Sequence, residues 1–287
     1  MTNLSIFTLV FMTQIFLLSV FYPGKLLQRM RTIQKKYPES THPKLYPKST
    51  NYYQKMSSFY GIINGLIFIL GWVIVYYVHE GSLVSEKGIN QMLPWVYFMI
   101  QMIPTWLLEI FGFRLSKLMK QEDTRKQKSA TLAPRRLTEY VSPQLLSAVI
   151  ITYFVFVVIA FYIEGCKFEL DGKAFQMSVI LLLCYAFFFG MMSWLIYGKK
   201  PDPYQSKTDR IKTITLVIKT YCYTMMACAF FMVFALAVSI HGLKSMMPVA
   251  MSLFLQFIVV ISMGYMLHNN RLEDINFDVY RADSETS

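Results

Sequence analysis

The sequence predicts an all-α polytopic membrane protein, a bundle of seven transmembrane helices with the N-terminus outside the cell and the C-terminus in the cytoplasm. The first observation is composition: of 287 residues, 55% are hydrophobic and 16% are charged, whereas about 25% of an ordinary soluble domain is charged. The second is a set of long apolar runs, and the third is the gathering of basic residues in alternate segments between them. This combination excludes a disordered chain, a coiled coil, a disulfide-framed secreted domain and almost any soluble enzyme.

Each apolar run is long enough to cross a membrane as a helix, which takes about 20 mostly apolar residues. A strand of a membrane barrel would be about half as long and would alternate apolar with polar residues. In lipid, only a helix satisfies its own backbone over such a length. Residues 1–20 contain no Lys or Arg, so we expect a retained helix there and not a signal peptide. The predicted spans, within one transmembrane domain, lie near residues 4–22, 59–78, 93–113, 145–163, 175–197, 216–240 and 248–267.

The distribution of Lys and Arg predicts the orientation of the spans. Segments 23–57, 114–140 and 198–219 and the C-terminal tail together hold 24 basic residues, whereas the intervening segments hold 4. The positive-inside rule assigns the basic segments to the cytoplasm. Membrane orientation therefore explains the net charge of +11, and we expect no nucleic-acid partner. Short loops without processing signals favour a bacterial cytoplasmic (inner) membrane as the location.

The segments outside the spans differ in charge. Residues 23–57 and 114–140 are predicted as basic cytoplasmic loops, and residues 268–287 as an acidic cytoplasmic tail. We expect the tail to be a frayed terminus. Because its charge is opposite to that of the loops, docking of the tail over the loops is the alternative.

The beginning of the first loop has the pattern of an amphipathic helix. Basic residues fill the faces on either side of one apolar face, which holds Leu26, Leu27, Met30 and Ile33. This pattern favours a helix that lies on anionic lipid. The alternative is a continuation of the first span, broken at Pro23.

Basic residues close to the predicted membrane surface are expected to contact anionic lipid headgroups or phosphate. The alternative for Arg135 and Arg136 is that they only form the positively charged flank of the fourth span. The predicted partners are thus the lipid bilayer, anionic lipids at the cytoplasmic face and a possible protein partner. The residues expected to make these contacts are Lys25, Arg29, Arg31, Lys35, Lys36, Arg135 and Arg136.

Polar residues inside the spans are the intramembrane candidates for function. Glu109 is the only acid at membrane depth, and such a residue is a functional hypothesis by default. It lies near the inner rim of the third span. If it is functional, we expect it to pair with Asn64 or with basic residues around Arg114; the alternative is a structural acid that snorkels to the rim. Neutral polar side chains in spans either join helices by hydrogen bonds or line a polar cavity. The neutral candidates are Gln14, Asn64, Gln101 and Gln256.

Several chemistries lack the residues that they need. The histidines fall in loops or at span ends, and the sequence has no HExxH, no Walker A loop and no pair of intramembrane aspartates. The 4 cysteines include no CxxC pair, so we expect neither a disulfide nor a zinc site. We therefore predict a protein without catalytic residues, cofactor or metal.

Two functional classes fit these observations. The leading one is a non-enzymatic small-solute transporter or facilitator, whose path the polar intramembrane residues would line. The alternative is a membrane scaffold or accessory subunit that docks a partner on its basic cytoplasmic face. Weak similarities between spans one to three and five to seven also raise a three-plus-three repeat as a hypothesis.

Overall fold

The computed structural model describes residues 3–85, 88–123, 136–166, 169–198 and 202–282. These residues form helices, apart from one small hairpin between β1 (Val84–Ser85) and β2 (Gly88–Ile89), in which Val84 pairs with Ile89. The hairpin was not predicted, because two residues per strand leave no alternating pattern in the sequence. The long helices are α3 (Thr50–Glu80), α4 (Leu93–Glu122), α5 (Pro143–Ile163), α6 (Lys173–Tyr197) and α7 (Lys207–Ile240).

Two further long helices are composite. Helix α1 (Asn3–Phe16) passes through the π-helical turn η1 (Leu17–Phe21) into α2 (Tyr22–Lys36). Helix α8 (Met247–Val259) passes through the π-helical turn η5 (Val260–Gly264) into α9 (Tyr265–Asn269). Short 3-10 turns occupy several connections: η2 (Pro43–Leu45), η3 (Leu137–Glu139), η4 (Lys244–Met246), η6 (Leu272–Asp274) and η7 (Asp278–Tyr280).

The described residues thus form seven helices that are long and apolar enough to cross a membrane, as predicted. In the most apolar stretch of each helix, only 17% to 39% of the residues are buried inside the protein. Large apolar side chains such as Leu66, Phe154 and Leu183 are instead 59% to 64% exposed. An apolar surface of this extent is typical of a protein whose outer face contacts lipid.

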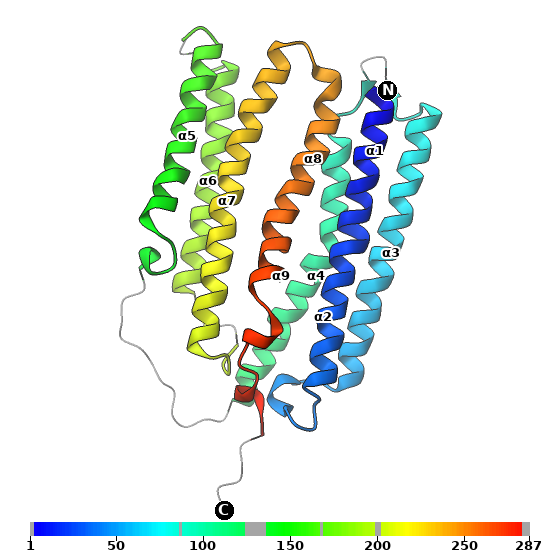
Figure 1. Cartoon of the computed structure of the whole chain (residues 1–287), viewed down its shortest axis with the longest axis vertical. Coiled ribbons are helices and arrows are strands. Elements are labelled where there is room, and N and C mark those ends of the chain that lie inside the picture. Colours follow the sequence, from blue (N-terminus) through cyan, green and yellow to red (C-terminus); the bar gives the residue numbers. More distant parts are fainter. Residues whose placement is uncertain (1–2, 86–87, 124–135, 167–168, 199–201, 283–287) are drawn as a thin grey trace, which may run out of the picture.

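The seven helices form two groups that lie side by side (Figure 1). The first group contains α1–α2, α3, α4 and α8–α9, and the second contains α5, α6 and α7. Helix α7 joins the groups, because it also contacts α8, η5 and α9. The last span therefore packs with the first three, which is not the grouping that the three-plus-three repeat predicts.

The prediction of an interfacial helix at residues 25–36 is wrong. These residues continue the first span as α2, and η1 carries the helix past Pro23 without a break. The apolar face of α2 is half-buried against α3 and not spread on lipid. Leu27 Cδ1 lies 3.6 Å from where a Cβ on Gly61 would be, which is an ordinary van der Waals distance, so Leu27 packs against α3 at this position.

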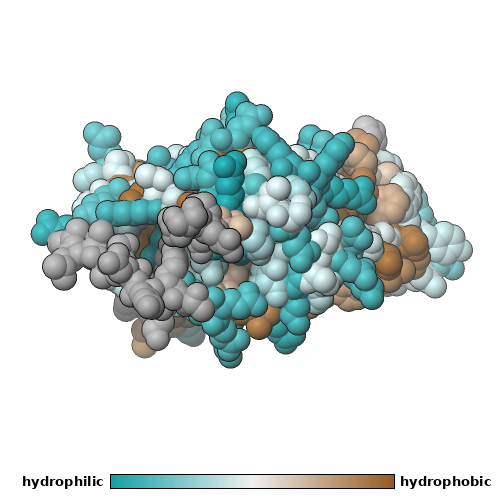
Figure 2. Space-filling view, turned by 90° about the horizontal axis from the view of Figure 1, so that it is seen from below, coloured by the Kyte–Doolittle hydropathy of each residue, from teal (hydrophilic) through white to brown (hydrophobic). Residues whose placement is uncertain are grey.

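The described parts of the predicted basic loops are also largely helical. Of residues 23–57, only 37–49 lie outside the long helices, and α4 continues to Glu122. These extensions, the start of α7 and the C-terminal segment lie together at one end of the bundle, here named the basic end (Figure 1). Figure 2 shows this end, which is covered mainly by hydrophilic residues.

The start of α5 and the state of the cysteines are two further local features. Ser142 caps α5, with its hydroxyl oxygen accepting a hydrogen bond from the backbone N–H of Leu145 at 3.3 Å and Pro143 at the first helical position. All four cysteines are free thiols, so the chain contains no disulfide.

Candidate functional site

Three of the predicted intramembrane residues meet in one hydrogen-bond network in the first group. Gln14 Nε2 donates to Gln101 Oε1 at 3.2 Å, and Ser252 Oγ donates to Gln14 Oε1 at 2.6 Å. Gln101 Nε2 in turn donates to Ser19 Oγ at 2.9 Å, and Gln256 Nε2 reaches Ser252 Oγ at 3.4 Å. We name Gln14, Ser19, Gln101, Ser252 and Gln256 the glutamine network. It joins α1, η1, α4 and α8, which are far apart in the sequence.

The surrounding backbone completes the network. Gln14 Nε2 also reaches the carbonyl oxygen of Pro94 at 3.2 Å, and Gln256 Nε2 donates to that of Val10 at 3.0 Å. Helix α3 packs closely against both α1 and α4 at Gly71, because a Cβ there would overlap the side chains of Ile15 on α1 and Tyr97 on α4. This close packing positions α4 beside α1. Side-chain amides here serve as donors and acceptors between helices, a use that is common in membrane proteins.

The centre of the network is buried, whereas Gln256 at its edge is half-buried. Gln14 and Ser252 are 0% exposed and Gln101 is 2% exposed. Their polar atoms are engaged by one another and by the backbone, so in this conformation they do not line an open polar path. A neutral, internally bonded cluster of this kind holds helices together, and it offers no general acid, base or nucleophile.

The other two intramembrane candidates lie elsewhere. Asn64 is buried, and its Nδ2 donates to the carbonyl oxygen of Tyr60 in the same helix at 2.8 Å. Glu109 is exposed on α4 beside Trp106 and Ile110, which are 47% and 48% exposed. The predicted pair between Glu109 and Asn64 therefore does not form, since the amide is satisfied by its own helix.

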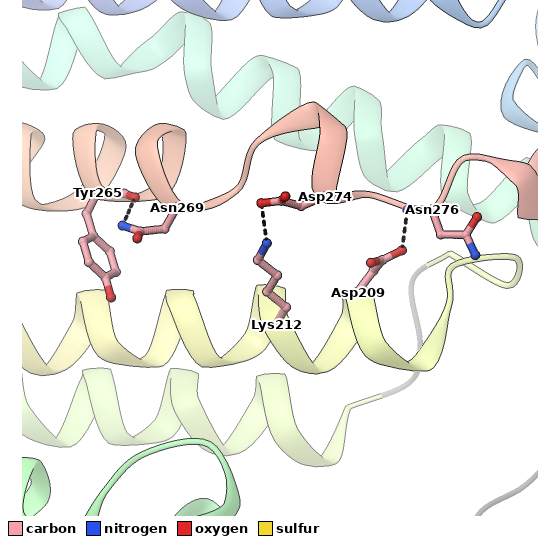
Figure 3. A network of polar contacts seen from close by, with 6 residues as sticks. All are labelled: Asp209, Lys212, Tyr265, Asn269, Asp274 and Asn276. Carbon is pink, nitrogen blue, oxygen red and sulfur yellow. Dashed lines mark hydrogen bonds and ion pairs between the residues drawn. The ribbon is translucent and has the colours of Figure 1, made fainter.

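A second polar site holds the C-terminal segment onto the basic end. Lys212 Nζ donates to Asp274 Oδ2 at 2.8 Å, and the backbone N–H of Asn276 donates to Asp209 Oδ2 at 3.1 Å (Figure 3). The same view shows Asn269 Nδ2 donating to the carbonyl oxygen of Tyr265 at 2.8 Å, just before the segment leaves α9. Residues 270–282 are named the tail clasp. The expectation of a frayed terminus is wrong for these residues, because specific side-chain bonds hold them on α7.

Aromatic contacts extend the tail clasp to the loop after α2. The rings of Phe277 and Tyr37 stack with centroids 4.1 Å apart. Tyr280 is buried, and its hydroxyl donates to Asp202 in the segment before α7. One segment thus connects the loop of residues 37–49 with the start of α7. The sequence signal was the aromatic pair Phe277 and Tyr280 within an otherwise polar tail.

Titration of the tail clasp follows from these contacts. The hydrogen bond and the positive charge of Lys212 lower the pKa of Asp274, so this carboxylate stays ionised well into the acidic range. Burial raises the pKa of Tyr280, and the nearby charge of Asp202 raises it further. Both groups keep the protonation states that their bonds require at neutral pH.

The described part of the basic end exposes more basic than acidic side chains, although Glu122, Glu139 and Glu273 are also exposed, and several other acids are engaged in contacts within the protein. The engaged acids include Glu39, Asp202, Asp209, Asp274 and Asp278. By contrast, the predicted lipid-contact residues Lys25, Arg31, Lys35, Lys36 and Arg136 are exposed, and Arg29 is half-buried. Arg135 lies outside the described residues.

Comparison of the chain with family models, curated proteins and solved structures finds no match.

Proposed function

We propose that the protein is a non-enzymatic membrane scaffold or accessory subunit that docks an acidic partner on its basic end. The observation that carries the proposal is the contrast between its polar sites. The centre of the glutamine network is buried and internally satisfied, which favours a structural role for it. The basic end is instead built from helix extensions and the tail clasp, and it presents exposed positive charge.

The charge balance of the basic end supports a partner of negative charge. Arg114, Lys117 and Lys120 are exposed on the extension of α4. Several carboxylates of this end are bonded to other groups, and two of them, Asp274 and Asp278, pair with Lys212 and Arg281. A surface with an excess of positive charge favours fast and selective association with an oppositely charged surface.

Quantitative co-purification from native membranes in mild detergent tests this proposal. In the variant Lys117→Gln/Lys120→Gln, we expect proteins that accompany the wild-type chain to be depleted several-fold. The matched control is Lys173→Gln/Lys244→Gln, which removes the same charge from exposed positions at the opposite end. Recovery of the same proteins with both variants would contradict partner docking on the basic end.

A transporter or facilitator is the second candidate function, and the two π-helical turns favour it. Such turns are rare and often occur at functional sites. A Cβ on Gly264 in η5 would lie 2.7 Å from the hydroxyl of Tyr22, the residue that directly follows η1, so η5 packs closely against the start of α2. Movement there could open the glutamine network to a solute.

We further propose that the basic end faces the cytoplasm of a bacterial inner membrane, in accord with the positive-inside rule. Cysteine labelling of intact cells with an impermeant reagent tests the orientation. We expect Ser82→Cys to react and Ser40→Cys to be protected, both in a Cys166→Ser background that removes an exposed thiol. The opposite pattern would invert the topology.

A further inference from the structure

A groove at the basic end lies between α2 and the first residues of the tail clasp. Its volume is about 410 Å³. Its basic side chains come from two segments that are distant in the sequence, since Lys25 and Arg29 belong to α2 and Arg271 follows α9. The remaining lining residues are Gln28, Thr32, Leu267, Leu272 and Glu273.

Helical spacing and the tail clasp together build this groove. Residues 25, 28, 29 and 32 are three or four positions apart, so they share one face of α2. The opposite wall is held by the ion pair between Lys212 and Asp274, directly after the lining residues 271–273. Both walls therefore have fixed positions, and the positive charges converge from two sides.

The positive charge in the groove is only partly used by the protein itself, since Arg271 is close enough to Asp274 for its charge to help lower the pKa of that carboxylate. The side chains of Arg29 and Arg271 make no hydrogen bond or ion pair within the part of the chain that the structure describes. Lys25 Nζ lies 5.8 Å from the ring centroid of Phe21, a weak contact. Glu273 is the one acid of the lining, which leaves an excess of positive charge.

The groove also has an apolar side. Leu267 and Leu272 contribute to its lining, and Lys25 follows closely on the apolar run that ends at Tyr22. A ligand that fits has a negative headgroup with apolar chains beside it. Basic pockets between helices at the cytoplasmic side of a membrane bind lipid headgroups of this kind.

We propose that this groove is a binding site for the phosphate headgroup of an anionic phospholipid, held by Lys25, Arg29 and Arg271. The guanidinium groups bind phosphate oxygens through paired N–H donors, and the ammonium supplies a point charge. Gln28 offers a further amide donor. The site is independent of partner docking, because the cations proposed for docking lie on α4.

Native mass spectrometry of the full chain in detergent tests the proposal. The probes are dioleoyl phosphatidic acid, phosphatidylglycerol and phosphatidylcholine, with glycerol phosphate as the soluble source of the same anion. We expect anionic lipids to bind more tightly than phosphatidylcholine and to resist displacement by glycerol phosphate. Equal binding of the lipids, or displacement by glycerol phosphate at comparable concentration, would overturn the assignment.

Matched double variants distinguish a specific binding site from non-specific electrostatic attraction to the basic end. Removing one cation close to a phosphate surface is expected to weaken binding about fivefold, so Lys25→Gln/Arg29→Gln loses more than tenfold. Lys55→Gln/Lys207→Gln removes the same number of charges from exposed positions outside the groove and changes binding less than about twofold. An equal loss in both double variants would overturn the proposal.

Two single variants test whether α2 and the residues that follow α9 contribute to the same binding site. Arg271→Gln should weaken anionic lipid binding about fivefold, although it changes a segment 242 positions from Arg29. Glu273→Gln should tighten binding, because it removes the one negative charge of the lining. A gain of affinity cannot result from damage to the fold. Unchanged binding in both variants would contradict a shared site.

Discussion

The two helix groups are held together by different interactions. In the first group, Gln14, Gln101 and Ser252 form hydrogen bonds between three helices at the centre of the packing. In the second group, the side chains at the centre are apolar: Phe156 and Ile218 are both 0% exposed. A few hydrogen bonds supplement this core, such as that from the hydroxyl of Tyr185 to the carbonyl oxygen of Met225 at 3.1 Å.

This difference shows two ways in which helices associate in a membrane, where lipid tails compete with neighbouring helices for apolar contacts. Lipid tails are as apolar as leucine, so helix association in a membrane depends on close packing and on polar contacts. The second group depends mainly on dispersion between well-fitted side chains. The first group adds specific bonds, which fix the mutual positions of α1, α4 and α8. Each group should therefore respond to a different kind of substitution.

The largest effect is expected in the glutamine network. Gln14→Leu removes the contacts to Gln101, Ser252 and the carbonyl of Pro94, and leaves buried polar atoms without partners. We expect a loss of about 3 kcal/mol in the free energy of unfolding. Reversible unfolding in mixed detergent micelles measures it. The double variant Gln14→Leu/Gln101→Leu should lose less than the sum of its single variants, and strict additivity would contradict the network.

A smaller loss is expected in the apolar core of the second group. Phe156→Ala leaves a cavity among residues that include Val149 and Ile218. We expect a loss of about 2 kcal/mol in the free energy of unfolding, less than in a soluble core, because transfer of the ring to lipid is not unfavourable. The same unfolding assay applies, with the exposed Phe154→Ala as control. Equal effects of the two variants would contradict the proposed core.

The tail clasp should open locally, without unfolding either group. Phe277→Ala removes the stacked contact with Tyr37 and is expected to cost about 1 kcal/mol of local stability. Amide hydrogen exchange of residues 272–280 should then become about fivefold faster. Asp278→Asn serves as control, since Asp278 is exposed and pairs with the nearby Arg281. Unchanged exchange in Phe277→Ala would indicate that the aromatic contacts do not hold the segment.

The smallest effect is expected at Glu109. Its side chain is exposed and has no hydrogen bond or ion pair among the described residues. Glu109→Gln should therefore change the free energy of unfolding by less than about 0.5 kcal/mol. A loss comparable to that of Gln14→Leu would show that the carboxylate has a partner inside the bundle.

The sequence predicted the seven spans well, because length and apolar content alone decide whether a helix can cross lipid. It also identified Gln14, Gln101 and Gln256, since a polar side chain stands out within an apolar run. It did not identify Ser252 or Ser19 as their partners, because serine is common in spans. The spacing of four between Ser252 and Gln256, which places them on one face of α8, was the available signal.

The packing of residues 25–36 and the docking of the tail at the basic end could not be predicted from the local sequence pattern. An amphipathic segment such as residues 25–36 shows which face is apolar, but not whether lipid or another helix covers that face. In the structure α2 packs against α3, with Leu27 next to Gly61. The docking of the tail likewise depends on tertiary contacts of Phe277 and Asp274, which no periodicity in the sequence records.

The central claim is that the glutamine network joins helices and does not line a solute path. The most direct test is the reactivity of Ser252→Cys toward a small, water-soluble thiol reagent in native membranes, in a Cys166→Ser background. Ser252 is 0% exposed at the centre of the network, so we expect no labelling while the exposed control Ser82→Cys reacts fully. Labelling of Ser252→Cys at a rate similar to that of the control would place water at the network and contradict the claim.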